Sequence, residues 1–289
     1  MVTAITPDNF GTSESPLVRI ESLTIEFGRQ RVLNNITLNI PRGQTLAVIG
    51  ESGCGKTVLL KTIIGLIRPS GGEILFDNRN LSRLSDKALT EQRIRFGYLF
   101  QNAALFDSMT IGQNVAFPLR QHRQIPEHQV QQMVLDRLAE VGLPDTVVPK
   151  KPAELSGGMR KRVGMARALI LSPELMLYDE PTTGLDPIMS DVINELMMSA
   201  GQQKIDHKPV TSIVVTHDMH TTRKVADRVI MLYPNARLRP GESQIIFDGP
   251  PSELDSFPDK RVSQFVRGEA GERLMEMRRE AHAPHGNAF

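Results

Sequence analysis

The stretch Gly50-Glu51-Ser52-Gly53-Cys54-Gly55-Lys56-Thr57 has the form G-x-x-x-x-G-K-[ST]. It follows an apolar run, Thr45 to Ile49, and leads into a helical pattern from Val58 to Leu66. A buried strand that turns through glycines into a helix N-terminus can direct several backbone N–H groups at phosphate oxygens. Lys56 can then reach the β- and γ-phosphates of a nucleotide, and Thr57 can hold Mg²⁺. The alternative is a plain glycine turn, and the correct flanking pattern favours the phosphate loop.

Composition sets limits on the remaining possibilities. The chain has 289 residues, 40% of them hydrophobic, which is enough for a core in one large or two small domains. Its net charge of +1 gives no electrostatic reason to expect nucleic acid as a partner. The single cysteine, Cys54, cannot form an internal disulfide and fits a reduced, cytoplasmic setting. No stretch approaches the ~18 apolar residues of a spanning helix, so we expect any membrane role to be peripheral and to depend on a partner.

A second strong signal is the apolar run Leu175 to Tyr178, which ends in Asp179 and Glu180. A continuous apolar run predicts a strand that is buried on both faces, and ligands bind at the carboxyl ends of such strands. We expect Asp179 to hold Mg²⁺, directly or through water, and Glu180 to act as general base toward the attacking water. A carboxylate that caps the next loop is the alternative, and it explains one acid better than two.

Two further residues follow predicted core strands. Gln101 comes after the strand Phe96 to Phe100, where it is either an ordinary strand cap or an amide that contacts Mg²⁺ and the attacking water. His217 comes after Val210 to Thr216, where it can donate to a γ-phosphate or lie on the surface. Each signal is weak by itself.

Two other signals stay open when taken alone. Ser156 precedes Gly157 and Gly158 at the start of a helical run, which is either an anion site or a capped hinge. Phe27 precedes a glycine turn and is either a core aromatic or a platform on which adenine stacks.

The chain divides into three parts. Residues 1–16 are expected to be a flexible lead-in, 17–250 to form the main domain, and 251–289 to be an extension with a disordered end. Within the main domain, residues 102 to about 170 form an inserted helical subdomain, because apolar residues recur there at helical spacing. We expect Pro118, among other prolines, to lie in its loops.

In combination and in order, these motifs resemble the ATP-binding subunit of ABC transporters over about residues 17–250. The matches are Phe27 (adenine-stacking aromatic), Gly50 to Thr57 (Walker A), Gln101 (Q-loop), Leu155 to Met159 (signature), Asp179 and Glu180 (Walker B and catalytic glutamate), Gly184 to Asp186 (D-loop) and His217 (switch histidine). The resemblance implies an α/β P-loop NTPase fold: a RecA-like core with an antiparallel β subdomain and an inserted α-helical subdomain.

The resemblance also implies roles and cofactors. ATP and Mg²⁺ would be the cofactors, and two copies would form a head-to-tail homodimer with ATP between them. Catalytic roles would fall to Lys56, Gln101, Glu180 and His217, metal binding to Thr57, Gln101 and Asp179, and ATP binding to Phe27, the whole loop from Gly50 to Thr57, Ser156, Gly157, Gly158 and Asp186.

The signature ends in Met159, where the family usually has Gln, and Arg160-Lys161-Arg162 follows. This ending resembles the subfamily that energises Mla/Mce lipid-trafficking systems. Three other stretches resemble it too, Leu99 to Phe106, Asn114 to Arg120 and Asp259 to Phe265. The resemblance implies phospholipid trafficking through a membrane permease, with an Mce-type substrate-binding component, at the cytoplasmic face of the inner membrane.

Three alternatives remain. An importer ATPase for amino acids or another small solute would have the same phosphate sites and a different partner. A soluble ABC ATPase acting on ribosomes or DNA usually has two fused cassettes or a long coiled-coil insertion, and this chain has neither. A module that holds ATP without hydrolysing it is disfavoured by Glu180 and His217.

The tail after Ser252 is expected either to pack across the dimer or to pack on its own subunit or remain free.

Overall fold

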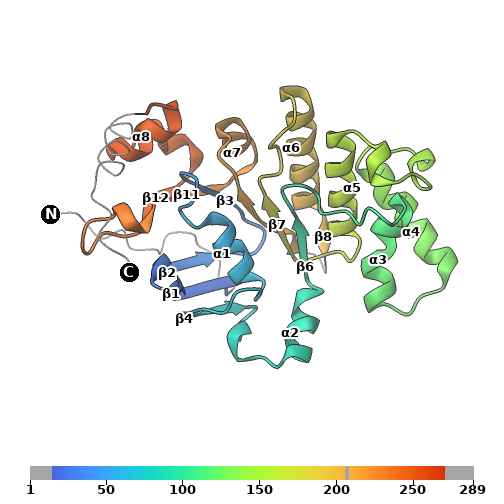
Figure 1. The fold of residues 1–289 in the computed structure, drawn as a ribbon, viewed down its shortest axis with the longest axis horizontal. Helices are drawn as coiled ribbons and strands as arrows, with labels where there is room; N and C mark the ends of the chain where they lie inside the picture. Colours follow the sequence, from blue (N-terminus) through green and yellow to red (C-terminus); the bar gives the residue numbers. More distant parts are fainter. Residues whose placement is uncertain (1–14, 206–207, 271–289) are drawn as a thin grey trace, which may run out of the picture.

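The computed structural model describes residues 15–205 and 208–270, and its centre is a six-stranded sheet (Figure 1). The strand order is β12-β11-β3-β10-β7-β6, and all neighbours are parallel except β11 and β12. Its strands are β3 (Thr45–Ile49), β6 (Phe96–Leu99), β7 (Leu175–Asp179), β10 (Thr211–Val215), β11 (Arg228–Leu232) and β12 (Ile245–Gly249). The predicted strand at 45–49 is confirmed, and so is the one that begins at Leu175, which includes Asp179 as its last residue.

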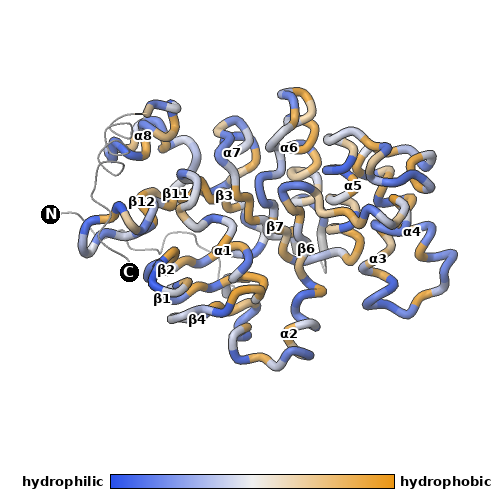
Figure 2. The backbone as a smooth tube through the Cα atoms, in the orientation of Figure 1, coloured by the Kyte–Doolittle hydropathy of each residue, from blue (hydrophilic) through white to orange (hydrophobic). Residues whose placement is uncertain are grey.

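Apolar runs without alternation produce the centre of this sheet. Every residue of β7, β10 and β11 is buried, because helices cover both faces. Figure 2 shows the hydrophobic tube running through these central strands. The covering helices are α1 (Lys56–Ile63), α5 (Gly157–Leu169), α6 (Pro187–Gln202) and α7 (Met219–Val225). A parallel sheet of this kind places the ends of β3, β10, β7 and β6 along one edge, where the predicted polar residues lie.

A second, antiparallel sheet has the order β2-β1-β4-β5. Its strands are β1 (Val18–Phe27), β2 (Gln30–Ile40), β4 (Gly71–Phe76) and β5 (Arg79–Asn80); α2 (Asp86–Arg93) follows, and β8 (Lys204–Ile205) pairs with β9 (Lys208–Pro209) elsewhere. An ion-pair cluster of Arg42, Asp77, Arg95 and Glu174 joins the two main sheets. Hydrogen bonds from Arg95 hold the pKa of the Glu174 carboxyl below its usual value.

Helices α3 (Ile111–His122) and α4 (Glu127–Glu140) pack with α5 around a separate apolar cluster. Placing Pro118 in a loop was wrong, because it lies inside α3. A capping box of Thr110 and Gln113 starts this helix, and the buried side chains Val115 and Leu119 anchor it. Burial and capping thus outweigh the ~3 kcal/mol that an interior proline costs a helix.

The C-terminal part ends in helix α8 (Lys260–Arg267), at the opposite end of the molecule from α3 and α4 (Figure 1). Leu254 and Val262 are buried against Val229 and Phe247 of the sheet. The described part of the tail therefore packs on its own chain; the lead-in and the charged end fall mostly outside the described residues. Among residues 15–205 and 208–270, no helix is both long and apolar enough to cross a membrane.

Candidate active site

The loop from Gly50 to Thr57 connects β3 to α1, and its glycines are required by the backbone. Gly50 has φ 139° and Gly55 has φ 103°, which L side chains rarely adopt. A Cβ on Gly50 would lie 2.2 Å from the Leu232 carbonyl oxygen, and one on Gly55 would lie 2.7 Å from a Leu33 methyl. Helix α1 begins without a side-chain cap, so its first N–H groups are available to an anion. The geometry is that of a phosphate cradle.

Lys56 is buried and folds back across the loop. Its Nζ donates to the carbonyl oxygens of Gly50, at 2.7 Å, and Glu51, at 3.0 Å. These bonds hold the ammonium group at the mouth of the loop. A positive charge held in this position suits the outer phosphates of a nucleotide.

Thr57 and Asp179 meet as the sequence predicts for two magnesium ligands. The Thr57 hydroxyl donates to Asp179 Oδ1 at 3.0 Å, although the two residues lie on α1 and β7. Tyr98, on the neighbouring strand β6, donates to the other oxygen, Oδ2, at 3.1 Å. Burial, followed by the charge of Asp179, raises the pKa of Tyr98, so its hydroxyl stays a donor. Hard oxygen donors of this kind fit Mg²⁺.

Glu180 and His217 form a pair next to this group. Nδ1 of His217 lies 2.9 Å from Glu180 Oε2, and the Thr183 hydroxyl donates to the same oxygen at 3.0 Å. The Glu180 side chain is 14% exposed, whereas that of His217 is 63% exposed. Glu180 has φ 50°, a left-handed conformation that is unfavourable for a residue with a side chain. The neighbouring bonds thus hold a strained residue with its carboxylate directed at His217.

Lys161 of α5 was not singled out from the sequence. Its buried Nζ donates to the Glu180 carbonyl oxygen at 2.9 Å. Burial lowers the pKa of Lys161 to about 8, and the charges of Glu180 and Asp179 oppose that shift. This places a cation directly behind the two Walker B carboxylates.

Gln101 lies at the same edge of the sheet, two residues after β6. It lines a cavity of about 290 Å³ together with Lys161 and Thr183. Its amide is therefore near the Glu180 loop.

Ser156 and Asp186 each cap a helix other than the one that follows the phosphate loop. The Ser156 hydroxyl caps α5 by accepting from the Met159 N–H, and Asp186 caps α6 by accepting from the Met189 N–H. Gly158 packs against Leu185 and Met189, whereas Gly157 is exposed. In the described part of the chain, no hydrogen bond joins Ser156 to Lys56 or Thr57. The two predicted phosphate-binding surfaces therefore stand at the N-termini of two different helices, α1 and α5.

Phe27 ends β1, and half of its surface (50%) is exposed. This is unusual for a large aromatic side chain and argues against a core role. The exposed ring is compatible with stacking on a base.

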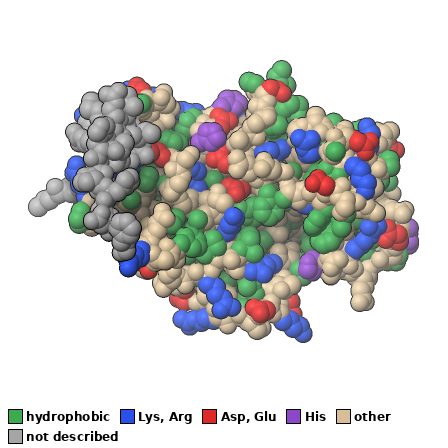
Figure 3. Space-filling view, viewed as in Figure 1, with side chains coloured by type: hydrophobic (Ala, Val, Ile, Leu, Met, Phe, Trp, Pro, Cys, Tyr) green, Lys and Arg blue, Asp and Glu red, His purple; other side chains and the backbone are tan. Residues whose placement is uncertain are grey.

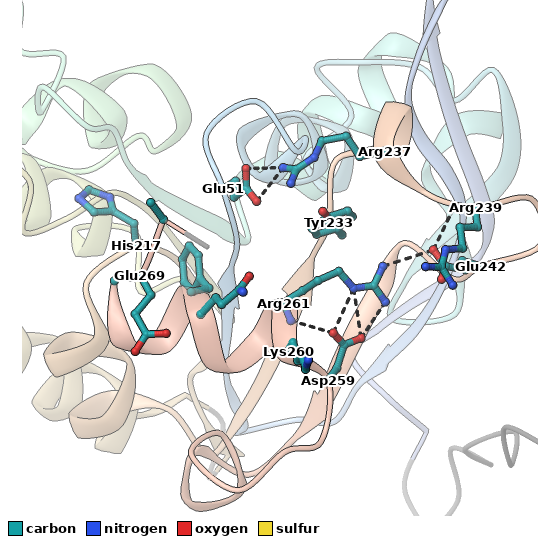
Figure 4. Close-up of a pocket in the computed structure, with 14 residues that line it drawn as sticks. Glu51, His217, Tyr233, Arg237, Arg239, Glu242, Asp259, Lys260, Arg261 and Glu269 are labelled. Atoms are coloured by element: carbon teal, nitrogen blue, oxygen red, sulfur yellow. Dashed lines mark hydrogen bonds and ion pairs between the residues drawn. The ribbon is translucent and has the colours of Figure 1, made fainter. Parts of the chain in front are cut away.

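A cavity of about 880 Å³ lies beside the phosphate loop (Figure 4). Arg237 donates to both carboxylate oxygens of Glu51, at 2.8 and 2.6 Å. The Tyr233 ring lies between two guanidinium groups, 4.7 Å from that of Arg237 and 4.9 Å from that of Arg261. These contacts connect the loop to the start of α8. The loop is also bonded to the residue before β12, because the Gln244 amide donates to the Cys54 carbonyl.

Cys54 itself is buried in the loop, and burial raises the pKa of its thiol. A thiol in such an environment forms less of the reactive thiolate.

The residues that the sequence missed, Tyr98, Lys161, Thr183 and Arg237, act through the predicted ones. Tyr98, Lys161 and Arg237 each contact a predicted residue from a different element, so these contacts depend on the tertiary fold. Thr183 lies in the same loop as Glu180, three residues further along the chain.

Comparison with known proteins supports the same assignment. The sequence pattern of the ABC transporter family matches residues 33–183. The chain is 39% identical over 254 residues to the Haemophilus influenzae intermembrane phospholipid transport system ATP-binding protein MlaF, covering 88% of this chain and 91% of that protein. It is 40% identical over 251 residues to the probable ribonucleotide transport ATP-binding protein mkl of Mycobacterium tuberculosis, covering 87% of this chain and 66% of the relative.

Among solved structures, one ATP-binding cassette, a dimer in a post-hydrolysis state bound to ADP and Pi, matches with a TM-score of 0.70 at 30% identity. The match covers 81% of this chain and 98% of that one. The sheet order, the phosphate loop and the paired carboxylates therefore have a common explanation: this chain belongs to the ABC transporter family, as one of its ATP-binding subunits.

Proposed function

We propose that this chain is the ATP-hydrolysing subunit of a transporter that moves phospholipid across the cell envelope. The assignment of ATP hydrolysis rests on the arrangement of two residue pairs at the edge of the sheet. Thr57 and Asp179 meet at 3.0 Å, and Glu180 and His217 meet at 2.9 Å. A module that only held nucleotide would have no need of the second pair.

In the proposed reaction, Glu180 accepts a proton from water, and the water oxygen attacks the γ-phosphorus as the bond to ADP breaks. Lys56 and the N–H groups of the loop bind the phosphates. His217 positions the γ-phosphate, and Phe27 holds the base. Mg²⁺, held by Thr57, Asp179 and Gln101, would neutralise charge on the phosphate oxygens.

We propose that the active form is a head-to-tail homodimer. Ser156 to Gly158 start α5, whereas Lys56 starts α1, and we propose that they cover the nucleotide bound by the other chain, with Asp186 beside them. Such enclosure excludes water and strengthens the electrostatic interactions with the phosphates. The solved relative bound to ADP and Pi, which is a dimer, supports this arrangement.

The membrane partner would be a permease with an Mce-type component, bound at the cytoplasmic face of the inner membrane. Similarity to MlaF over 91% of that protein supports phospholipid as the substrate. Ribonucleotide is the second candidate, because of the 40% identity to mkl, but there the chain spans only 66% of the relative.

The test is to purify the native complex from membranes and identify the molecules that co-purify. We expect phospholipid, a permease and ATPase activity that falls when the lipid is stripped. A complex that carries a nucleotide or amino acid in place of lipid would refute the proposal that phospholipid is the substrate. Recovery of the chain without any membrane partner would refute the proposal that it works in a transporter.

A further inference from the structure

Lys161 is a buried cation with no part in the reaction described above. It is the fifth residue of α5, and only 5% of its surface is exposed. Burying an ammonium group is costly unless the group is paired and hydrogen-bonded. Its Nζ donates to the Glu180 carbonyl oxygen at 2.9 Å, and the Asp179 and Glu180 carboxylates attract it. The position of this charge is therefore tied to a single peptide unit.

That peptide belongs to a residue under strain. Glu180 has φ 50°, and such a conformation persists only where its surroundings fix it. Three bonds hold its backbone. Its N–H donates to Val215 O at 2.9 Å, and its carbonyl accepts from the Thr183 N–H at 3.3 Å and from Lys161 at 2.9 Å. The Lys161 bond is the only one of the three that comes from a charged donor, and such bonds are the stronger kind.

We propose that Lys161 is a positioning residue for Glu180. By fixing the carbonyl of this left-handed residue, it directs the carboxylate toward His217 and toward the water to be activated. The inference rests on the proposed function, which makes Glu180 the general base. A purely structural role, in which Lys161 only joins α5 to the loop after β7, is the rival.

The test compares Lys161→Met with Lys161→Arg and with a control. We expect Lys161→Met to lower kcat about 10- to 100-fold, because small misplacement of a reacting group has effects of that size. The KM for ATP should stay within about twofold, since no phosphate contact is lost. Lys161→Arg, which keeps the charge and the donor, should recover much of the rate. A drop in kcat that Arg does not rescue would overturn the proposal.

Arg162→Met is the matched control. Arg162 is the next residue of α5, and it also donates to a backbone carbonyl, that of Gly142 at 2.8 Å, in the segment that follows α4. This variant should keep the wild-type kcat. An equal loss of kcat in Arg162→Met and Lys161→Met would favour the purely structural role and overturn the proposal.

A double variant separates positioning from a general effect. In a Glu180→Gln background there is no base to position, so adding Lys161→Met should leave the residual hydrolysis unchanged. A further loss by the same factor as in the wild type would refute the proposal. If Lys161→Met does not fold, Lys161→Gln, which keeps a donor without the charge, replaces it in the same cycle. Absence of hydrolysis in the wild-type complex would instead refute the proposed function, so the two failures are distinguishable.

Discussion

Replacing Glu180 by Gln is the sharpest test of the hydrolytic site. The substitution keeps the size of the side chain, and the amide oxygen can still accept from Thr183, which now donates at 3.0 Å. The backbone bonds to Val215 and Lys161 do not involve the side chain, so the strained conformation should survive. The substitution removes the ability to accept a proton, together with the negative charge that faces His217 and Lys161. We therefore expect a folded protein that binds ATP normally.

The expected magnitude follows from the loss of the base. A positioned general base contributes roughly 10²- to 10⁴-fold to a rate, which corresponds to about 2.7–5.5 kcal/mol of transition-state stabilisation. The kcat of Glu180→Gln should fall by this factor, while the affinity for ATP stays the same. Because hydrolysis is what would open the proposed dimer, the variant should accumulate as an ATP-bound dimer.

Two measurements check this result. Phosphate release under saturating ATP gives kcat, and size-exclusion chromatography with and without ATP gives the dimer fraction. Glu91→Gln, an exposed change on α2, is the control and should match the wild type in both. A rate of phosphate release within about threefold of the wild type would refute the general-base role, because a loss of that size is far smaller than the expected 10²- to 10⁴-fold. Loss of hydrolysis without an ATP-dependent dimer would refute the shared site.

Three further predictions concern the residues around the site. Lys56→Ala should abolish turnover or weaken ATP binding at least about tenfold, because it removes the charge held over the loop; unchanged activity would exclude Lys56 from the site. Tyr98→Phe removes one of the two donors to Asp179, so urea unfolding should show a loss of about 1.5–3 kcal/mol, whereas wild-type stability would mean that the bond contributes nothing. Glu174→Gln should lower stability at pH 7 and much less at pH 3. Arg95 holds the pKa of Glu174 below its usual 4.5, so this stabilisation is present above pH 4.5 and is lost as the pH falls through the folded pKa. An equal effect at both pH values, measured by denaturant titration, would contradict the prediction.

Local sequence was sufficient for the elements that carry the chemistry. The strand before the phosphate loop has the predicted bounds, and the strand that begins at Leu175 extends to Asp179, because continuous apolar runs followed by polar residues are typical of buried parallel strands. It could also be predicted that the polar residues after these strands lie near one another, because the carboxyl ends of parallel strands share one edge of the sheet. The helix containing Pro118 could not, because its stability depends on burial against α4 and α5.

The charges on the surface give little information about a binding partner, as the near-zero net charge suggests. In Figure 3, Lys and Arg side chains are interspersed with Asp and Glu side chains over the visible face. That mixture agrees with the net charge of +1.

The residues that sequence reasoning missed have a common physical origin. Tyr98 reaches Asp179 from the neighbouring strand, and Lys161 reaches Glu180 from a helix that packs beside it. Neither contact follows from spacing along the chain, because each depends on two elements meeting in the folded core. The buried Asp179 carboxylate accepts from Thr57 and Tyr98, and an unpaired carboxylate in the core would be costly. Lys161 instead donates to the backbone carbonyl of Glu180, which fixes the peptide of a strained residue. Both needs could be expected from the sequence, but only the fold determines which side chains meet them.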